Sequence, residues 1–279
     1  MARPVTISLV TTCFNAAGLL PVTLRSIRQQ SLLLDSKACF EYIIVDAAST
    51  DRTMEVIRVA AADLPITVIS EPDRGVYDGL AKGFALCTGD VVGYLNAGDF
   101  LFPGALEVIR DAFSNTTASW MTGYSTLANE KWQPIRVELP FRYRREFFLN
   151  GIHGTSLPTL QQESTFWRRE LMDDLDWEKF RSMKLAGDFL LWQHFSRTEL
   201  PAILHSLVGA FCAHPGQLSS DNSKYVRELQ SLCRTPYLAD KVRAAIERIL
   251  WKAPHGVKRR LADGKHITYD DGTGHFKFT

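Results

Sequence analysis

The sequence has no apolar run that approaches the ~20 residues of a membrane-spanning helix. It also has almost no excess charge, because 32 Lys and Arg stand against 31 Asp and Glu in 279 residues. A net charge of +1 gives the chain as a whole no electrostatic reason to bind nucleic acid. With 46% hydrophobic and 23% charged residues, the composition is that of an ordinary globular protein, long enough for one large domain or two small ones.

Cysteine is scarce, and its spacing is uninformative. The five cysteines are odd in number and widely separated, so they match neither a zinc site nor a redox motif (Cys13, Cys39, Cys87, Cys212 and Cys233). Most lie in apolar stretches, so we expect reduced core side chains. Because no signal peptide is recognisable either, the pattern favours a cytoplasmic protein.

Strands and helices alternate in the first part of the chain. Buried strands are expected at 5–14, 40–50, 66–70 and 90–95, with helices between them and another at 103–113. This order favours a parallel sheet covered on both faces, whose ligands bind at the carboxyl ends of the strands. Asp46 and Asp99 each follow such a strand. No glycine-rich, lysine-containing phosphate loop follows the first strand, which disfavours a nucleotidyltransferase.

The regular alternation of strands and helices ends after Asn115. The segments 120–127 and 134–139 suggest an antiparallel pair, a helix opens just after Gly187, and a strand at 202–214 ends in His214. We divide the chain into 1–222 (halves about 1–115 and 116–222), a helical extension at 223–262 and an irregular tail at 263–279. The extension is amphipathic and basic, since ten Lys/Arg against three Asp/Glu between 224 and 260 give 10 − 3 = +7.

Six fragments occur in the order typical of one family: VTTCFNAAGLLPVTLRSI, EYIIVDAASTDRT, SEPDRGVYDGLAKGFALCTGDVVGYLNAGD, QESTFWRREL, AGDFLLW and HPGQLS. Over about residues 5–220 the chain resembles the family 2 glycosyltransferases of GT-A fold. The resemblance implies an α/β fold with a Rossmann-like, mostly parallel sheet and helices on both faces, here followed by the helical extension.

The resemblance also implies a site for a sugar nucleotide. Phe14 stands where the family often has a tyrosine facing the base, and Ala47 stands where it commonly has an acid or glycine. The residues expected to bind the donor are Phe14, Asp46, Asp73, Arg74, Asp78 and Asn96. Each also has a structural interpretation: Phe14 as a core aromatic, and the polar residues as turn or cap residues.

The loop after the fourth strand resembles the family's acidic metal motif, with Asn96 and Gly98 in place of two acids. Asp99 remains as the expected ligand of Mn²⁺ or Mg²⁺, aided by His214, although either side chain could instead be structural. One or two carboxylates suffice for a hard cation that also binds phosphate oxygens. The loop at 216–220 is a candidate lid.

Asp188 corresponds to the family's general base, and its alternative role is a helix N-cap. Gln162 and Glu163 are expected in the acceptor pocket, while Trp167 is expected in the core. The resemblance thus implies an inverting glycosyltransferase acting on a hydroxyl acceptor, a lipid-linked one included, in bacterial surface polysaccharide or glycolipid assembly. A catalytically silent sugar-nucleotide-binding protein is the alternative. The basic helix predicts peripheral membrane contact at the inner face of the cytoplasmic membrane, or packing on the domain or in a homodimer.

Overall fold

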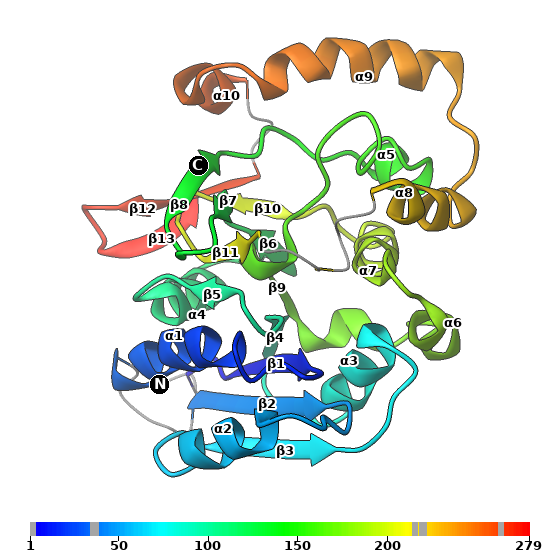
Figure 1. Cartoon of the computed structure of the whole chain (residues 1–279). Coiled ribbons are helices and arrows are strands. Elements are labelled where there is room, and N and C mark those ends of the chain that lie inside the picture. Colours follow the sequence, from blue (N-terminus) through cyan, green and yellow to red (C-terminus); the bar gives the residue numbers. More distant parts are fainter. Residues whose placement is uncertain (1–3, 34–38, 214–216, 218–221, 262–264) are drawn as a thin grey trace.

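A computed structural model of the chain describes residues 4–33, 39–213, 217, 222–261 and 265–279 (Figure 1). Its main feature is a nine-stranded sheet in the order β13-β12-β10-β6-β9-β4-β1-β2-β3. The strands are β1 (Ile7–Cys13), β2 (Phe40–Asp46), β3 (Ile66–Ser70), β4 (Val91–Tyr94), β6 (Trp120–Thr122), β9 (Thr165–Arg168), β10 (Ala202–Leu204), β12 (His266–Asp270) and β13 (His275–Phe278).

The first four of these strands form the parallel part that the sequence predicts. β1 pairs in parallel with both β2 and β4, and β2 pairs in parallel with β3. Neighbouring residues of β1 face opposite sides, so that Leu9 packs into one hydrophobic cluster and Val10 into another. Both faces are therefore covered, which confirms the α/β class with helices on each side.

The helices divide between those two faces. One cluster takes residues from α1, α2 and α4, and the other takes them from α3, α6, α7 and α8. The helices are α1 (Leu20–Leu33), α2 (Thr53–Ala60), α3 (Val76–Phe84), α4 (Ala105–Asn115), α5 (Arg145–Leu149), α6 (Trp177–Ser182), α7 (Gly187–Phe195), α8 (Asn222–Ser231), α9 (Leu238–Trp251) and α10 (His255–Arg260), with short 3₁₀ turns η2 (Gln162–Ser164) and η3 (Arg169–Met172).

A second, four-stranded sheet has the order β5-β11-β7-β8, formed by β5 (Phe100–Leu101), β11 (Gly209–Cys212), β7 (Ser125–Ala128) and β8 (Pro134–Glu138). The expected antiparallel pair is β7 with β8, whereas β6 joins the large sheet. The single strand expected at 202–214 is wrong, because β10 and β11 lie in different sheets. Gly209 permits the second strand to pass η2, since a Cβ there would collide with the carbonyl of Glu163.

The irregular tail expected at 263–279 is also wrong. β12 pairs in parallel with β10, and β13 folds back antiparallel to extend the sheet. Buried Ile267 and Phe276 hold this hairpin on the core. The segment is short and mostly polar, so its sequence pattern does not indicate these two buried positions. Among the described residues, the five cysteines are free thiols and four are buried, as expected. No helix in the described part of the chain is long and apolar enough to cross a membrane.

Candidate active site

The carboxyl ends of β1, β2 and β4 meet at one edge of the sheet because these strands run in parallel. Phe14 directly follows β1 at this edge, and its side chain is 62% exposed. The core interpretation of Phe14 is therefore wrong. An aromatic ring held in the open is suited to stacking on a base, and that role stays a prediction.

Asp46 ends β2 and is completely buried. One carboxylate oxygen accepts the hydroxyl of Ser49 at 2.5 Å, and the other accepts the hydroxyl of Ser70 at 2.7 Å and the backbone N–H of Ser49 at 3.1 Å. Asp46 thereby ties the loop after β2 to the end of β3. Its direct contact with a donor stays a prediction, since these hydrogen bonds already use both oxygens.

The loop between β3 and α3 is held by its own acids. Asp73 accepts the backbone N–H of Gly75 at 2.9 Å, and Asp78 accepts that of Arg74 at 3.1 Å. Asp78 also pairs with the guanidinium groups of Arg74 and Arg181, at 3.4 and 3.1 Å. Burial opposes ionisation of Asp78, but these hydrogen bonds outweigh it and hold its pKa below the ordinary value. Arg74 remains largely exposed, where a diphosphate could meet it.

The turn after β4 places Asn96 and Asp99. Gly98 has φ +106°, a left-handed conformation that disfavours other residues. The hydroxyl of Thr23 accepts the N–H of Gly98 and donates to the carbonyl of Asp99, which fixes the turn to α1. Asn96 is half-buried, and its side-chain oxygen accepts the Thr12 hydroxyl at 3.3 Å, which leaves its amide group as a candidate donor to a ligand.

Asp99 is buried beside Glu163 of η2, with which it shares a hydrogen bond. Burial and the Glu163 charge raise the pKa of Asp99 well above its usual range, although one oxygen accepts the N–H of Cys212 at 2.9 Å. Burial also raises the pKa of Glu163, against hydrogen bonds that include the amide of Gln162. The sequence assigned these two acids to different subsites, and the structure brings them together.

This carboxyl pair fits a divalent cation. Neither acid has a cationic partner among the described residues, and hard cations take one or two carboxylates together with phosphate oxygens. The predicted second metal ligand, His214, and the predicted lid at 216–220 lie outside the described residues, apart from Gln217. In the described part of the chain, no third His, Cys, Asp or Glu completes a metal-binding group with the pair.

Asp188 lies in the first turn of α7, whose N-cap is Ala186. The N-cap interpretation of Asp188 is therefore wrong, although one oxygen accepts the adjacent N–H of Phe189 at 2.7 Å. Burial, with help from the Glu163 charge, raises the pKa of Asp188 to about 7. A carboxyl group that changes protonation near neutral pH is suited to proton transfer.

Three tyrosines surround Asp188. Tyr77 and Tyr94 are buried, and the hydroxyl of Tyr225 lies 3.4 Å from the Asp188 carboxylate. Burial raises the pKa of Tyr77 and Tyr94 well above the ordinary value, and the Asp188 charge adds to the effect, so both stay protonated. A Cβ at Gly187 would collide with the Tyr77 ring, so the glycine of the AGD motif allows α3 and α7 to touch.

Sequence reasoning missed the contribution of α8 to this centre. The Glu228 carboxylate accepts the backbone N–H groups of Lys184, Leu185 and Ala186 at 2.8, 2.6 and 2.7 Å. It thus fixes the loop that leads into α7, while Tyr225 from the same helix reaches Asp188. Both residues lie beyond the fragments that carry the family resemblance, so no motif pointed to them.

Two neighbours of the site are structural. Trp167 is fully buried, as expected. The Arg168 guanidinium donates to the backbone carbonyls of Phe113, Thr116 and Ala118, which joins β9 to the end of α4.

Comparison with known proteins shows the family and the fold of the chain. The family described as Glycosyl transferase family 2 matches residues 8–175, more than half of the chain, so the chain belongs to that family. A "PGL/p-HBAD biosynthesis glycosyltransferase" from Mycobacterium tuberculosis is 35% identical over 104 residues, which cover 37% of this chain and 38% of that protein. The matched region thus spans well under half the length of that relative.

Two solved structures share the fold. TarS 1–349 from S. aureus in complex with UDP-GlcNAc has a TM-score of 0.59 at 13% identity, covering 91% of this chain and 69% of that one. The mannosyltransferase PcManGT from Pyrobaculum calidifontis, in complex with GDP-Man and Mn²⁺, has a TM-score of 0.56 at 16% identity, covering 93% and 79%. The architecture is therefore GT-A, as the resemblance implied.

Proposed function

We propose that this protein is an inverting glycosyltransferase that moves a sugar from a nucleoside-diphosphate sugar to a hydroxyl acceptor. The observation that carries the proposal is Asp188, a carboxyl group with a pKa of about 7 beside the buried Asp99–Glu163 pair. General bases work best when their pKa lies near the operating pH. Family membership supplies the reaction class, and the position of Asp188 supplies the group that moves the proton.

In the proposed reaction, Asp188 accepts the proton of the acceptor hydroxyl while the hydroxyl oxygen attacks the anomeric carbon of the donor sugar. The new bond forms on the face opposite the leaving group, and the bond between the anomeric carbon and the diphosphate oxygen breaks with its electron pair. The transition state is oxocarbenium-like, as in other glycosyl chemistry. Tyr77 and Tyr225 orient the carboxylate, and Glu228 holds the loop that presents it.

Asp99 and Glu163 would hold Mn²⁺ or Mg²⁺. A cation bound there would neutralise charge on the leaving diphosphate. The exposed Arg74 would contribute positive charge from the β3–α3 loop, and Phe14 would stack on the base. Two structures of the same fold bind different nucleotides, one UDP-GlcNAc and the other GDP-Man, so the fold leaves the choice of base open.

The biological setting we propose is assembly of a bacterial surface polysaccharide or glycolipid. It is supported by the name of the mycobacterial relative, which assigns that protein to PGL/p-HBAD biosynthesis. The acceptor would then be a sugar or lipid hydroxyl at the inner face of the cytoplasmic membrane.

A panel of UDP-, GDP- and dTDP-sugars with Mn²⁺, Mg²⁺ or EDTA tests the proposal, with thermal stabilisation and nucleotide release as readouts. We expect sugar nucleotides of one base to stabilise the protein in a metal-dependent way. When an acceptor is added, we expect release of the corresponding nucleoside diphosphate. The anomeric configuration of the product, measured by NMR, decides between inversion and retention. Donor binding without turnover for any acceptor would instead favour a catalytically silent binding protein.

A further inference from the structure

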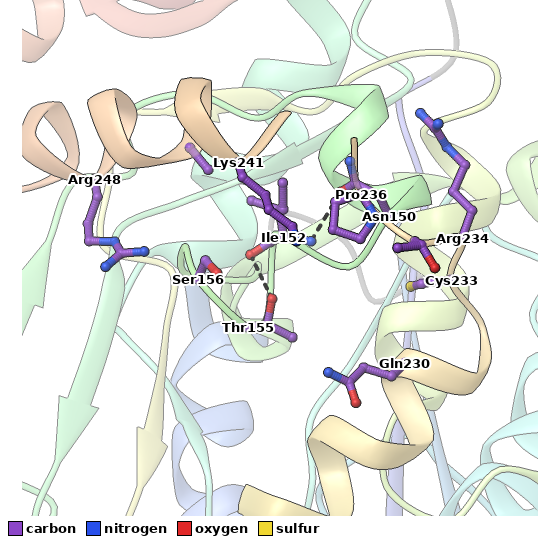
Figure 2. Close-up of a pocket in the computed structure, with 12 residues that line it drawn as sticks. Asn150, Ile152, Thr155, Ser156, Gln230, Cys233, Arg234, Pro236, Lys241 and Arg248 are labelled. Atoms are coloured by element: carbon purple, nitrogen blue, oxygen red, sulfur yellow. Dashed lines mark hydrogen bonds between the residues drawn. The ribbon is translucent and has the colours of Figure 1, made fainter. Parts of the chain in front are cut away.

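A pocket of about 500 Å³ lies between α9, the end of α8 and the loop that follows α5 (Figure 2). It is separate from the acidic centre, since none of the acids there lines it. Its lining carries three cations, Arg234, Lys241 and Arg248, and no carboxylate. Hydroxyl groups of Thr155 and Ser156 form the opposite wall, beneath α9 in the view of Figure 2.

The cations of this pocket are not neutralised by the protein. No ion pair joins Arg234, Lys241 or Arg248 to an acid in the described part of the chain. Between residues 224 and 260 the only acids are Glu228, Asp240 and Glu247. All three carboxylates bond inward: Glu228 to the loop before α7, Asp240 to Asn150, and Glu247 to Arg144. Arg234, Lys241 and Arg248 are exposed, whereas Lys258 of the same extension is buried.

α9 sorts its residues around the helix axis at about 100° per residue. Its buried side is Asp240, Ala244 and Glu247. Next around the axis come Lys241 and Arg248, which line the pocket. Beyond them lies an apolar stripe, Leu238, Val242, Ile246 and Ile249, whose members are 55% to 78% exposed. Lys241 and Arg248 thus lie between the pocket and the apolar stripe. Because the stripe is exposed, the expectation that it packs on the domain is wrong.

We propose that this pocket binds the phosphate group of an anionic lipid and docks α9 on the membrane surface. Guanidinium and ammonium groups suit a phosphate, and four exposed apolar side chains beside them suit acyl chains. A soluble phosphate would use the pocket but leave the stripe in water. A neutral apolar partner would use the stripe but leave the cations unpaired. An anionic lipid satisfies both features together.

The pocket and the transfer site share α8. Tyr225 of this helix reaches the predicted base, Glu228 bonds the loop that leads into α7, and Gln230, five residues after Tyr225, lines the pocket. At about 1.5 Å of rise per residue, roughly 8 Å of helix separates Tyr225 from Gln230. Docking on a lipid phosphate would therefore hold the transfer site close to the membrane, within reach of acceptors at its surface.

Vesicle sedimentation of the full chain tests the proposal, with phosphatidylcholine vesicles compared with vesicles that also contain phosphatidylglycerol. We expect binding only to the anionic vesicles. Arg248→Glu should weaken it roughly 10-fold or more, and Lys241→Glu with Arg248→Glu roughly 100-fold. The matched control is Arg243→Glu, an equal charge change on an exposed residue of α9 that does not line the pocket. It should lose only a few-fold.

Further measurements separate the other occupants. Ile246→Ser with Ile249→Ser should weaken vesicle binding while the stabilisation by inorganic pyrophosphate at constant ionic strength stays unchanged. Pyrophosphate stabilisation that Lys241→Glu with Arg248→Glu removes, without vesicle binding by the wild type, would overturn the lipid assignment in favour of a soluble phosphate. Equal losses of vesicle binding from Arg243→Glu and Arg248→Glu would overturn the proposal that the pocket is the binding site. A dimer in sedimentation velocity that the stripe variant dissociates, with no vesicle binding, would show that a second copy covers α9. Melting temperatures near that of the wild type are required of every variant.

Discussion

The acids of the donor side and the acids of the centre have opposite surroundings. Asp46 and Asp78 are as buried as Asp99 and Glu163, but hydroxyl groups, backbone N–H groups and guanidinium groups of the protein bond them. Asp99 and Glu163 face each other and have raised pKa values. Carboxyl groups of similarly low solvent exposure therefore meet two electrostatic environments.

This difference separates framework from chemistry. An acid that the protein itself satisfies stabilises a loop, whereas a buried acid with a raised pKa costs stability and is kept where a proton or cation will bind. On this argument Asp46 and Asp78 shape the nucleotide side. Asp99, Glu163 and Asp188 are the residues we propose to act on ligands. The predictions below test that division.

The largest effect is expected at Asp188. Asp188→Asn should reduce transfer by roughly 10²–10⁴-fold, because an amide of the same shape cannot take the acceptor proton. The fold and the donor affinity should be nearly unchanged, since Ala186 and not Asp188 is the N-cap of α7. Transfer rate, donor affinity and melting temperature measure the three quantities.

Asp176→Asn is the matched control, because Asp176 is the N-cap of the preceding helix, α6, and its carboxylate accepts the N–H of Lys179 at 3.0 Å. It should transfer at the wild-type rate, since asparagine caps about as well. If Asp188→Asn also kept the wild-type rate, Asp188 would not be the base.

Asp99→Asn is expected to remove the metal dependence of donor binding. Loss of a carboxylate ligand should weaken the Mn²⁺-dependent stabilisation by the nucleotide roughly 100-fold. Without metal the variant should be at least as stable as the wild type, because a neutral amide replaces a carboxyl group whose ionised form burial disfavours. Titration with nucleotide and Mn²⁺ or EDTA, followed by melting, separates the two effects. Donor binding insensitive to both EDTA and the substitution would assign the diphosphate to Arg74 instead.

The Asp99–Glu163 pair also determines whether stability increases or decreases with pH. Because Asp99 and Glu163 have raised pKa values, the folded protein holds more protons than the unfolded chain above about pH 4. Their contribution to stability therefore decreases as pH rises from there, in the absence of metal. Melting temperatures across this range should decline less steeply for Asp99→Asn.

The sequence could predict the strand–helix alternation and the positions of the edge residues, because the burial period and the strand ends are local properties. It could not predict that Glu163 meets Asp99, since η2 and β4 are brought together only by the pairing of β9 with β4. Nor could it predict the role of Tyr225 or Glu228, whose partners lie about 40 residues away in the chain. The apolar stripe of α9 could be predicted from the sequence. Its exposure to solvent could not, because the helix packs on the domain through Asp240 and Glu247 instead.

At Asp78 the expected effect is on stability. Asp78→Asn leaves Arg181 without its carboxylate and weakens the turn at Arg74, so we expect a loss of about 1.5–3 kcal/mol in unfolding free energy. Urea unfolding measures it. Glu55→Gln is the comparison, because its ion pair with Arg52 is exposed and such pairs contribute little. Equal losses for the two variants would contradict the framework role of Asp78.

The smallest effect is expected at Tyr225. Its phenol donates to the Asp188 carboxylate at 3.4 Å, which stabilises the ionised form and lowers the pKa of Asp188. Tyr225→Phe removes this bond, so the pKa should rise by up to about half a unit. Since the base acts deprotonated, the rate should increase with pH through about 7 in the wild type and at higher pH in the variant, with the same plateau. Tyr237→Phe, an exposed tyrosine of the same extension, should leave the profile in place. An unshifted profile in Tyr225→Phe, or a lower plateau with no shift, would mean that α8 holds the site in place without tuning its base.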